Sequence, residues 1–481
     1  MTLVWSIVAL AVVLLLGTAL LAACLPGAGG ERERGRLPWL IGAGFLVGVI
    51  ALTATMRAEA AIGVPFGVVP IGAPALAIAV ACAALARRRG SLHALAWRES
   101  LATLRLADAT RGVRVAWFAL LAWIALRVAL LASEAALRPL YAWDAWSVWA
   151  TKAKTFFAMR TIVPFVDTGA WNTSTVAVWF DAGPHQPVTL PLLQAWVATA
   201  GGTWDDAAAA LPWVAFLLAL VLVVYGEVRR RGAAPLHALV AAWLVGSLPL
   251  LGTQVALAGY ADLPLAAAFA LGTLAGLRAI ATRAPVDAVA AVAALVLVGT
   301  CKQSGWVWLV VALPGFAAAV LGPAFHRRIG IALVVFALAV VGIAARFPHF
   351  AIGPVSFAYA PVWETFAVES VLFANWHLLA LGIVGVAALE RRRLIDERMA
   401  PLTLIVAAGA IWIAMLAAFP SVRAWGADSL GLNRAVLVLA PLAIAWMAIA
   451  ILPSPRQPAP VAAPSPEPEP EPEGETASQA A

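Results

Sequence analysis

The chain has 481 residues, of which 63% are hydrophobic and 12% are charged. Soluble globular domains carry about twice that share of charged residues, so the composition excludes this class and indicates an integral membrane protein. The formal net charge of +7 does not indicate nucleic-acid binding, because the basic residues are spread over short connections and not gathered on one domain.

Long apolar segments recur along the whole chain. A membrane-spanning helix needs about 20 apolar residues, and the hydropathy pattern predicts thirteen spans. They cover residues 3–25, 38–56, 63–85, 114–134, 207–225, 235–253, 262–280, 285–301, 304–321, 329–345, 371–389, 401–419 and 434–452. We therefore expect an all-α fold, a polytopic membrane helix bundle.

The basic residues predict how the chain is oriented in the membrane. Taken alternately, one set of connections between spans holds most of the arginines, with runs at 87–89, 229–231 and 391–393. The positive-inside rule places this set in the cytoplasm, the N-terminus outside, the C-terminus in the cytoplasm and the long connection at 135–206 outside. Abundant Ala, Gly, Arg and Trp are typical of GC-rich bacterial genomes, so we expect a bacterial inner (plasma) membrane.

The pattern divides the chain into three parts. Residues 1–113 are expected to form an appended N-terminal module of three spans, and residues 114–452 a transmembrane core. Residues 453–481, rich in Pro and Glu, are expected to be a disordered cytoplasmic tail. Arg127 lies near the middle of the fourth span, where a charge is costly and should face a polar interior. Its role could be structural pairing or function.

The stretch Tyr141–Phe157, YAWDAWSVWATKAKTFF, gathers aromatic and charged residues at the outer membrane surface. As an interfacial α-helix it would place Trp143 and Trp146 on one face with Ala150, Ala153 and Phe157. The neighbouring face would carry Asp144 together with Lys154. Asp144 could act in chemistry, or it could merely balance the helix N-terminus.

The rest of this external connection contains weaker signals. His185 could be a loop hydrogen-bonding residue or a ligand, and Asp167 and Asp181 leave a metal site open. The metal ligands are therefore unknown, and a divalent cation is possible. The apolar segment at 188–200 is too short to span, so we expect an interfacial or re-entrant helix.

Further acids and bases are predicted at the outer ends of later spans. Asp262 could cap the helix that follows it, and Lys302 could snorkel to the surface or bind an anion. The last external connection carries Arg423 and ends at Arg434. Guanidinium groups bind phosphate in a bidentate manner, so these arginines are candidate phosphate ligands.

These motifs together resemble the GT-C membrane glycosyltransferases. The resemblance covers residues 114–452 and consists of Trp143-Asp144 after a span, the segment PVTLPLLQAW at 187–196, the turn GYADLP at 259–264, the Lys302 turn before Gly305, and Arg434 opening a final span with a proline. The nearest types would be protein O-mannosyltransferases and aminoarabinose transferases, similar to glycosyltransferase family 39. The resemblance implies a lipid-linked sugar donor, transfer on the external face and inversion at the anomeric carbon.

By position, Asp144 matches the catalytic first-loop Asp of that family. Many members have a second acidic residue beside it, whereas Ala145 follows here, which puts a metal-binding role of this loop in doubt.

The resulting hypothesis is an inverting glycosyltransferase with Asp144 as general base. Lys302, Arg423 and Arg434 would hold the phosphate of a polyprenyl-phosphate or diphosphate donor. The remaining candidates for substrate contact are Asp262, His185, Lys154 and Trp143. The expected partners are that donor, membrane lipid, and a glycan, lipid or protein acceptor. A transporter or flippase of lipid-linked sugars and a non-catalytic membrane assembly partner remain as alternatives.

Overall fold

The computed structural model describes residues 2–27, 33–95, 106, 109–352, 355–368, 371, 374–419 and 430–452. The described residues up to Ile451 belong to one compact unit. Arg423 and the Pro- and Glu-rich segment at 453–481 lie outside the described residues.

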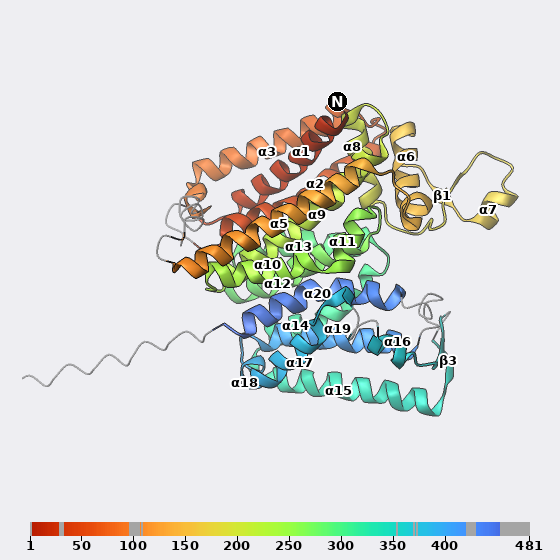
Figure 1. Cartoon of the computed structure of the whole chain (residues 1–481). Coiled ribbons are helices and arrows are strands. Elements are labelled where there is room, and N and C mark those ends of the chain that lie inside the picture. Colours follow the sequence, from red (N-terminus) through yellow and green to blue (C-terminus); the bar gives the residue numbers. More distant parts are fainter. Residues whose placement is uncertain are drawn as a thin grey trace, which may run out of the picture. The chain divides into compact units, whose positions relative to one another are not determined.

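Helices dominate the described part of the chain (Figure 1). The two pairs of short strands are β1 with β2, which are parallel, and β3 with β4, which are antiparallel. The helices are α1 (Thr2–Ala23), α2 (Arg36–Ala61), α3 (Val68–Arg88), η1 (Ser91–Leu95), α5 (Arg111–Leu137), η2 (Ala145–Trp149), α6 (Ala150–Met159), α7 (Thr168–Thr173), α8 (Thr189–Gly201), α9 (Asp206–Arg230), α10 (Pro235–Ser247), α11 (Pro249–Ala256), α12 (Asp262–Thr282), α13 (Pro285–Cys301), α14 (Gly305–Leu321), α15 (Pro323–Arg346), α16 (Trp363–Ala367), η4 (Ala374–Trp376), α17 (Leu379–Leu389), α18 (Arg391–Leu394), α19 (Ala400–Ala418) and α20 (Leu430–Ala450), and the strands are β1 (Phe165–Val166), β2 (Trp179–Phe180), β3 (His349–Ile352) and β4 (Val355–Ala358).

The prediction of an all-α, multi-pass membrane protein is confirmed. Within the described residues, nine helices are long and apolar enough to cross a membrane, or ten if the bent pair α10 and α11 is one span. The apolar helices α13, α14 and α17 fall on further predicted spans but have 10 to 17 residues. The number thirteen, the bacterial inner membrane and the orientation of the termini therefore stay predictions.

Helix α12 lies at the centre of the packing. Every residue from Asp262 to Leu277 is buried, and the helix contacts α9, α13, α14 and α20. This segment is rich in Ala and contains Gly272 and Gly276, and such small residues let several helices approach the same helix closely. The acidic first residue of α12 is therefore held inside the bundle.

Glycines allow α1 and α2 to pack with their backbones in close contact. A Cβ added at Gly48 would lie 1.9 Å from the Val13 carbonyl oxygen, and one at Gly17 would lie 1.8 Å from that of Gly44. Helix α2 also packs along α9 and α13. A separate module at residues 1–113 stays a prediction.

The apolar segment at 188–200 forms α8, whose residues Thr189–Ala198 are all buried. It packs on α1, α6 and α9. With 13 residues, α8 is too short to span a membrane, as the sequence predicts. Its side chains are buried because α1, α6 and α9 pack against it.

Arg127 has a structural role at a break between two helices. Helices α10 and α11 meet at an angle of 58°, where Pro249 follows Leu248. The Arg127 guanidinium donates to the carbonyl oxygens of Gly246 at 2.9 Å and Leu248 at 3.5 Å. A ring nitrogen of His377 lies 3.0 Å from the carbonyl oxygen of Ser247. Carbonyl groups freed at the break thus find polar partners, as a broken helix in a membrane requires.

This role predicts that Arg127→Met lowers the thermal stability of the protein in detergent by about 1–3 kcal/mol, because two carbonyl groups lose their donor. Arg138→Met is the matched control. Arg138 pairs with Glu134 at 2.7 Å while its side chain is 52% exposed, so its loss should cost less than about 1 kcal/mol. Equal effects of the two substitutions in thermal unfolding would contradict the capping role.

Candidate active site

Four charged side chains from distant parts of the chain meet at the first residue of α12. Asp262 pairs with the Lys302 ammonium and with Arg434 Nε, the latter at 2.6 Å. Arg434 Nη2 also pairs with Asp144 at 2.5 Å. The side chains of Asp262, Arg434 and Lys302 are 3%, 5% and 8% exposed, and that of Asp144 is 13% exposed. We call these four residues the charge cluster.

Each member is placed by the end of a different helix. Asp262 is the first residue of α12, Lys302 follows α13, and Arg434 is the fifth residue of α20. Asp144 directly precedes η2. The cluster therefore forms only when four helix ends converge.

Two structural interpretations left open by the sequence are wrong. Ala261, and not Asp262, is the N-cap of α12. Asp144 does occupy the N-cap position of η2, but its side chain makes no capping hydrogen bond. Both carboxylates are bound to cations instead. Lys302 is buried and does not snorkel, because its ammonium group is bound to Asp262.

The predicted single interfacial face of Tyr141–Phe157 is also wrong. Residues Ala145–Trp149 form a π-helical turn, which contains one more residue than an α-helical turn. This rotates Trp143 and Trp146, which are 63% and 50% exposed, away from the buried Ala150 and Ala153. The two indole rings pack edge to face with centroids 4.7 Å apart.

The turn before α12 brings this π-helical segment close. Gly259 has φ +110°, and a Cβ there would lie 2.3 Å from the Ala145 Cβ. The next residue, Tyr260, places its ring 5.1 Å from the Arg434 guanidinium. Burial, together with the negative charge of Asp144, raises the pKa of the Tyr260 phenol. Glycine at 259 thus permits the contact that positions Asp144.

Lys152 anchors the loop that follows, and it is one of the residues the sequence analysis missed. Its ammonium group donates to the carbonyl oxygens of Gly183 at 2.7 Å and Gln186 at 3.1 Å, and pairs with Asp181 at 3.1 Å. Burial lowers the pKa of Lys152, and the charge of Asp181 opposes this effect. Lys154, which the sequence analysis selected, is exposed.

The same loop joins two members of the charge cluster. Its Ala182 amide donates to the Ser147 carbonyl oxygen of η2 at 3.0 Å. The Gln186 side-chain oxygen accepts from the backbone amide of Gln303, next to Lys302, at 3.1 Å. Lys152 therefore fixes the spacing between the segment that carries Asp144 and the turn that carries Lys302.

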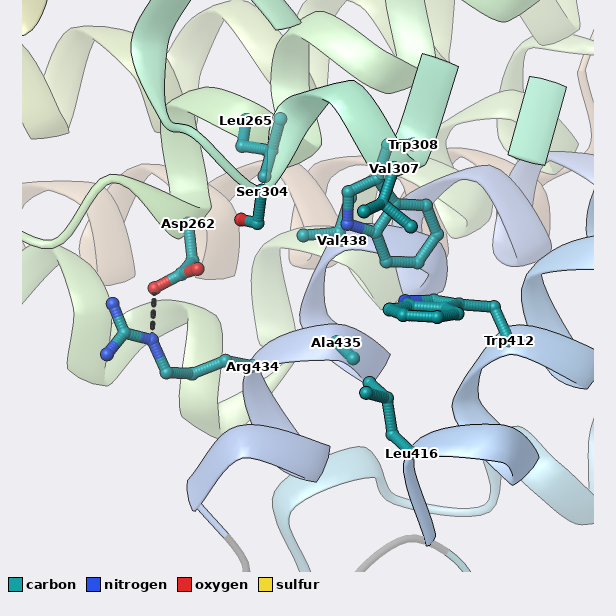
Figure 2. A pocket seen from close by; sticks show the side chains of 10 residues that line it. All are labelled: Asp262, Leu265, Ser304, Val307, Trp308, Trp412, Leu416, Arg434, Ala435 and Val438. Carbon is teal, nitrogen blue, oxygen red and sulfur yellow. Dashed lines mark hydrogen bonds and ion pairs between the residues drawn. The ribbon is translucent and has the colours of Figure 1, made fainter. Parts of the chain in front are cut away.

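A pocket opens beside the cluster and has a charged and an apolar end (Figure 2). It lies among α12, α14, α19 and α20. Asp262, Arg434 and Ser304 are at the charged end, and the indole rings of Trp308 and Trp412 are at the other end. The remaining lining residues are Leu265, Val307, Leu416, Ala435 and Val438.

The other predicted site residues lie elsewhere or are not described. Lys154, His185 and Trp143 are exposed. Arg423 lies outside the described residues.

The acids that left a metal site open have other partners. Asp167 accepts from the Ala170 amide at 2.8 Å, and Asp181 pairs with Lys152. Among the residues that the structure describes, no three His, Cys, Asp or Glu side chains form a candidate metal-ligand group.

The close approach at Gly259 predicts that Gly259→Ala displaces the segment that carries Asp144. The substitution combines an unfavourable positive φ with a steric clash, and overpacking typically costs about 1–3 kcal/mol. Gly232→Ala is the matched control, because Gly232 has φ +91° and an added Cβ there would meet nothing within 4 Å. Thermal unfolding in detergent should show the larger loss for Gly259→Ala, and equal losses would mean that only backbone strain matters.

The Lys152 anchor predicts that Lys152→Met is strongly destabilising, by about 3–5 kcal/mol, because it leaves the buried Asp181 without its cation. Lys154→Met removes the same charge two residues away at an exposed position and should leave the unfolding temperature within about 1 °C, as surface substitutions usually do. Similar unfolding temperatures for both variants would contradict the anchoring role.

Comparisons of the chain with protein-family models, with curated proteins and with solved structures find no match.

Proposed function

We propose that this protein is a glycosyltransferase that moves a sugar from a polyprenyl-phosphate or polyprenyl-diphosphate donor to an acceptor hydroxyl on the external face of the membrane. The observation that carries the proposal is the charge cluster at the end of an amphipathic pocket inside a membrane helix bundle.

The pocket matches the chemistry of a lipid phosphate. Arg434 lines its charged end, and Lys302 pairs with Asp262, which lines the same end. A guanidinium group binds phosphate through two parallel hydrogen bonds. The opposite end, with Trp308, Trp412 and Val307, suits an isoprenoid chain or the apolar face of a sugar ring. A headgroup with negative charge and an apolar tail satisfies both ends at once.

Asp144 is suited to be the general base, because it is the more exposed carboxylate of the cluster and lies next to Arg434, a proposed phosphate ligand. The acceptor oxygen attacks the anomeric carbon from the face opposite the phosphate and gives its proton to the Asp144 carboxylate. The bond between the anomeric carbon and the phosphate oxygen breaks, and the lipid phosphate leaves with both electrons. The phosphate is already anionic, so Lys302 and Arg434 stabilise it without a general acid.

One observation favours the rival function of a transporter or flippase for lipid-linked sugars. Helices α10 and α11 form a broken span, a feature of transporter binding sites. The break is capped by Arg127 and His377, however, and the pocket lies among other helices. The capped break and the position of the pocket among other helices therefore favour the glycosyltransferase over the transporter or flippase.

The proposal predicts that Asp144→Asn lowers the turnover number about 10²- to 10⁴-fold without raising KM for the donor, because the general base is lost while the phosphate ligands remain. The measurement is release of free polyprenyl phosphate from a donor with a radiolabelled sugar, in proteoliposomes with candidate acceptors. Asp396→Asn, at an exposed position after α18, is the control with the same chemical change.

Three outcomes separate the alternatives. Release by the wild type that is lost in Asp144→Asn supports the transferase. Movement of the intact labelled donor between leaflets without release indicates a flippase, and neither activity indicates a non-catalytic partner. Full release by Asp144→Asn would refute the general-base role.

A further inference from the structure

The charge cluster poses an electrostatic problem for a donor phosphate. Within the part of the chain that the structure describes, its two carboxylates balance its two cations, and all four side chains are at least 87% buried. An added phosphate would bring uncompensated negative charge into this site, which is costly in a weakly polar environment. Donor binding, on which this inference rests as part of the proposed function, therefore requires one carboxylate to leave its cation.

The two carboxylates differ in how firmly they are held. Asp262 contacts both Lys302 and Arg434 and belongs to a helix whose first four turns are buried on all sides. Asp144 pairs with one atom of one cation, Arg434 Nη2, and its side chain is 13% exposed against 3% for Asp262. Asp262 is thus a fixed counter-ion, and Asp144 is the exchangeable one.

The backbone around Asp144 also suits a change of position. It precedes the π-helical turn Ala145–Trp149, and such turns are a less stable form of helix that recurs at functional sites. Trp143 and Trp146 beside it are largely exposed, so no tight packing restrains this face of the segment.

We propose that in the empty protein Asp144 occupies the place on the Arg434 guanidinium that the donor phosphate takes. The phosphate displaces Asp144, keeps Arg434 paired and releases the carboxylate toward the acceptor. A carboxylate held on the guanidinium cannot turn toward the acceptor hydroxyl, whereas a released one can. Donor binding therefore activates the base, and the donor binds before the acceptor.

The test measures binding of radiolabelled polyprenyl phosphate to the purified full-length protein in detergent, with neutral polyprenol as the reference lipid. Asp144→Asn removes the competitor and should bind polyprenyl phosphate about tenfold more tightly than the wild type, within the usual range of coupling between two ligands of one site. Asp262→Asn is the matched control. It removes the same charge from the same guanidinium but loses the counter-ion that holds Lys302 and Arg434, so it should bind about tenfold more weakly.

The variants separate displacement from simple charge repulsion. Tighter binding by both variants would mean that any lost negative charge helps, and unchanged or weaker binding by Asp144→Asn would mean that Asp144 does not compete; either result overturns the inference. A wild type that does not prefer polyprenyl phosphate to polyprenol contradicts the proposed function itself.

A measurement on the wild type decides the matter if Asp262→Asn does not fold, as judged by thermal unfolding. Hydrogen exchange at the backbone amides of residues 141–149 should become faster with polyprenyl phosphate than with polyprenol, because the Asp144 anchor is released. Equal or slower exchange would overturn the inference.

Discussion

The Arg434 guanidinium joins two carboxylates that are far apart in the sequence. Its Nε pairs with Asp262, 172 residues away, and its Nη2 with Asp144, 290 residues away. Each of these charges is nearly buried, and an unpaired buried charge is costly, so none of the three segments can take its place without the others. The helix ends at Asp144, Asp262, Lys302 and Arg434 are thereby required to converge, and the pocket lies beside Asp262 and Arg434.

The sequence was sufficient for the class of fold because hydropathy is a local property. About 20 consecutive apolar residues identify a span whatever its neighbours are. The sequence also identified Asp144, Asp262, Lys302 and Arg434 as polar groups at the ends of helices. It could not pair them, because pairing depends on contacts between distant segments. Asp262 could therefore be interpreted as a cap and Lys302 as a snorkelling residue, and both interpretations were wrong.

The error in the helix around Asp144 has a single physical cause. Face assignments assume about 3.6 residues per turn, and the π-helical turn Ala145–Trp149 breaks that period. Trp143 before the turn and Trp146 within it are exposed, whereas Ala150 and Ala153 after it are buried. The same helix buries Lys152 and exposes Lys154. Lys152, Gln186 and Trp412 were missed because their roles depend on the loop and helices that reach them.

A site whose cations already have carboxylate partners can look poorly suited to an anionic substrate. In a buried environment the opposite holds, because cations without counter-ions would destabilise the empty protein. Exchange of a carboxylate for a phosphate leaves the number of paired cations unchanged, so both the empty and the occupied site avoid an uncompensated charge. Such an exchange requires only that one of the two counter-ions be held less firmly than the other. Asp144 meets this requirement, because it is more exposed than Asp262 and contacts one cation where Asp262 contacts two.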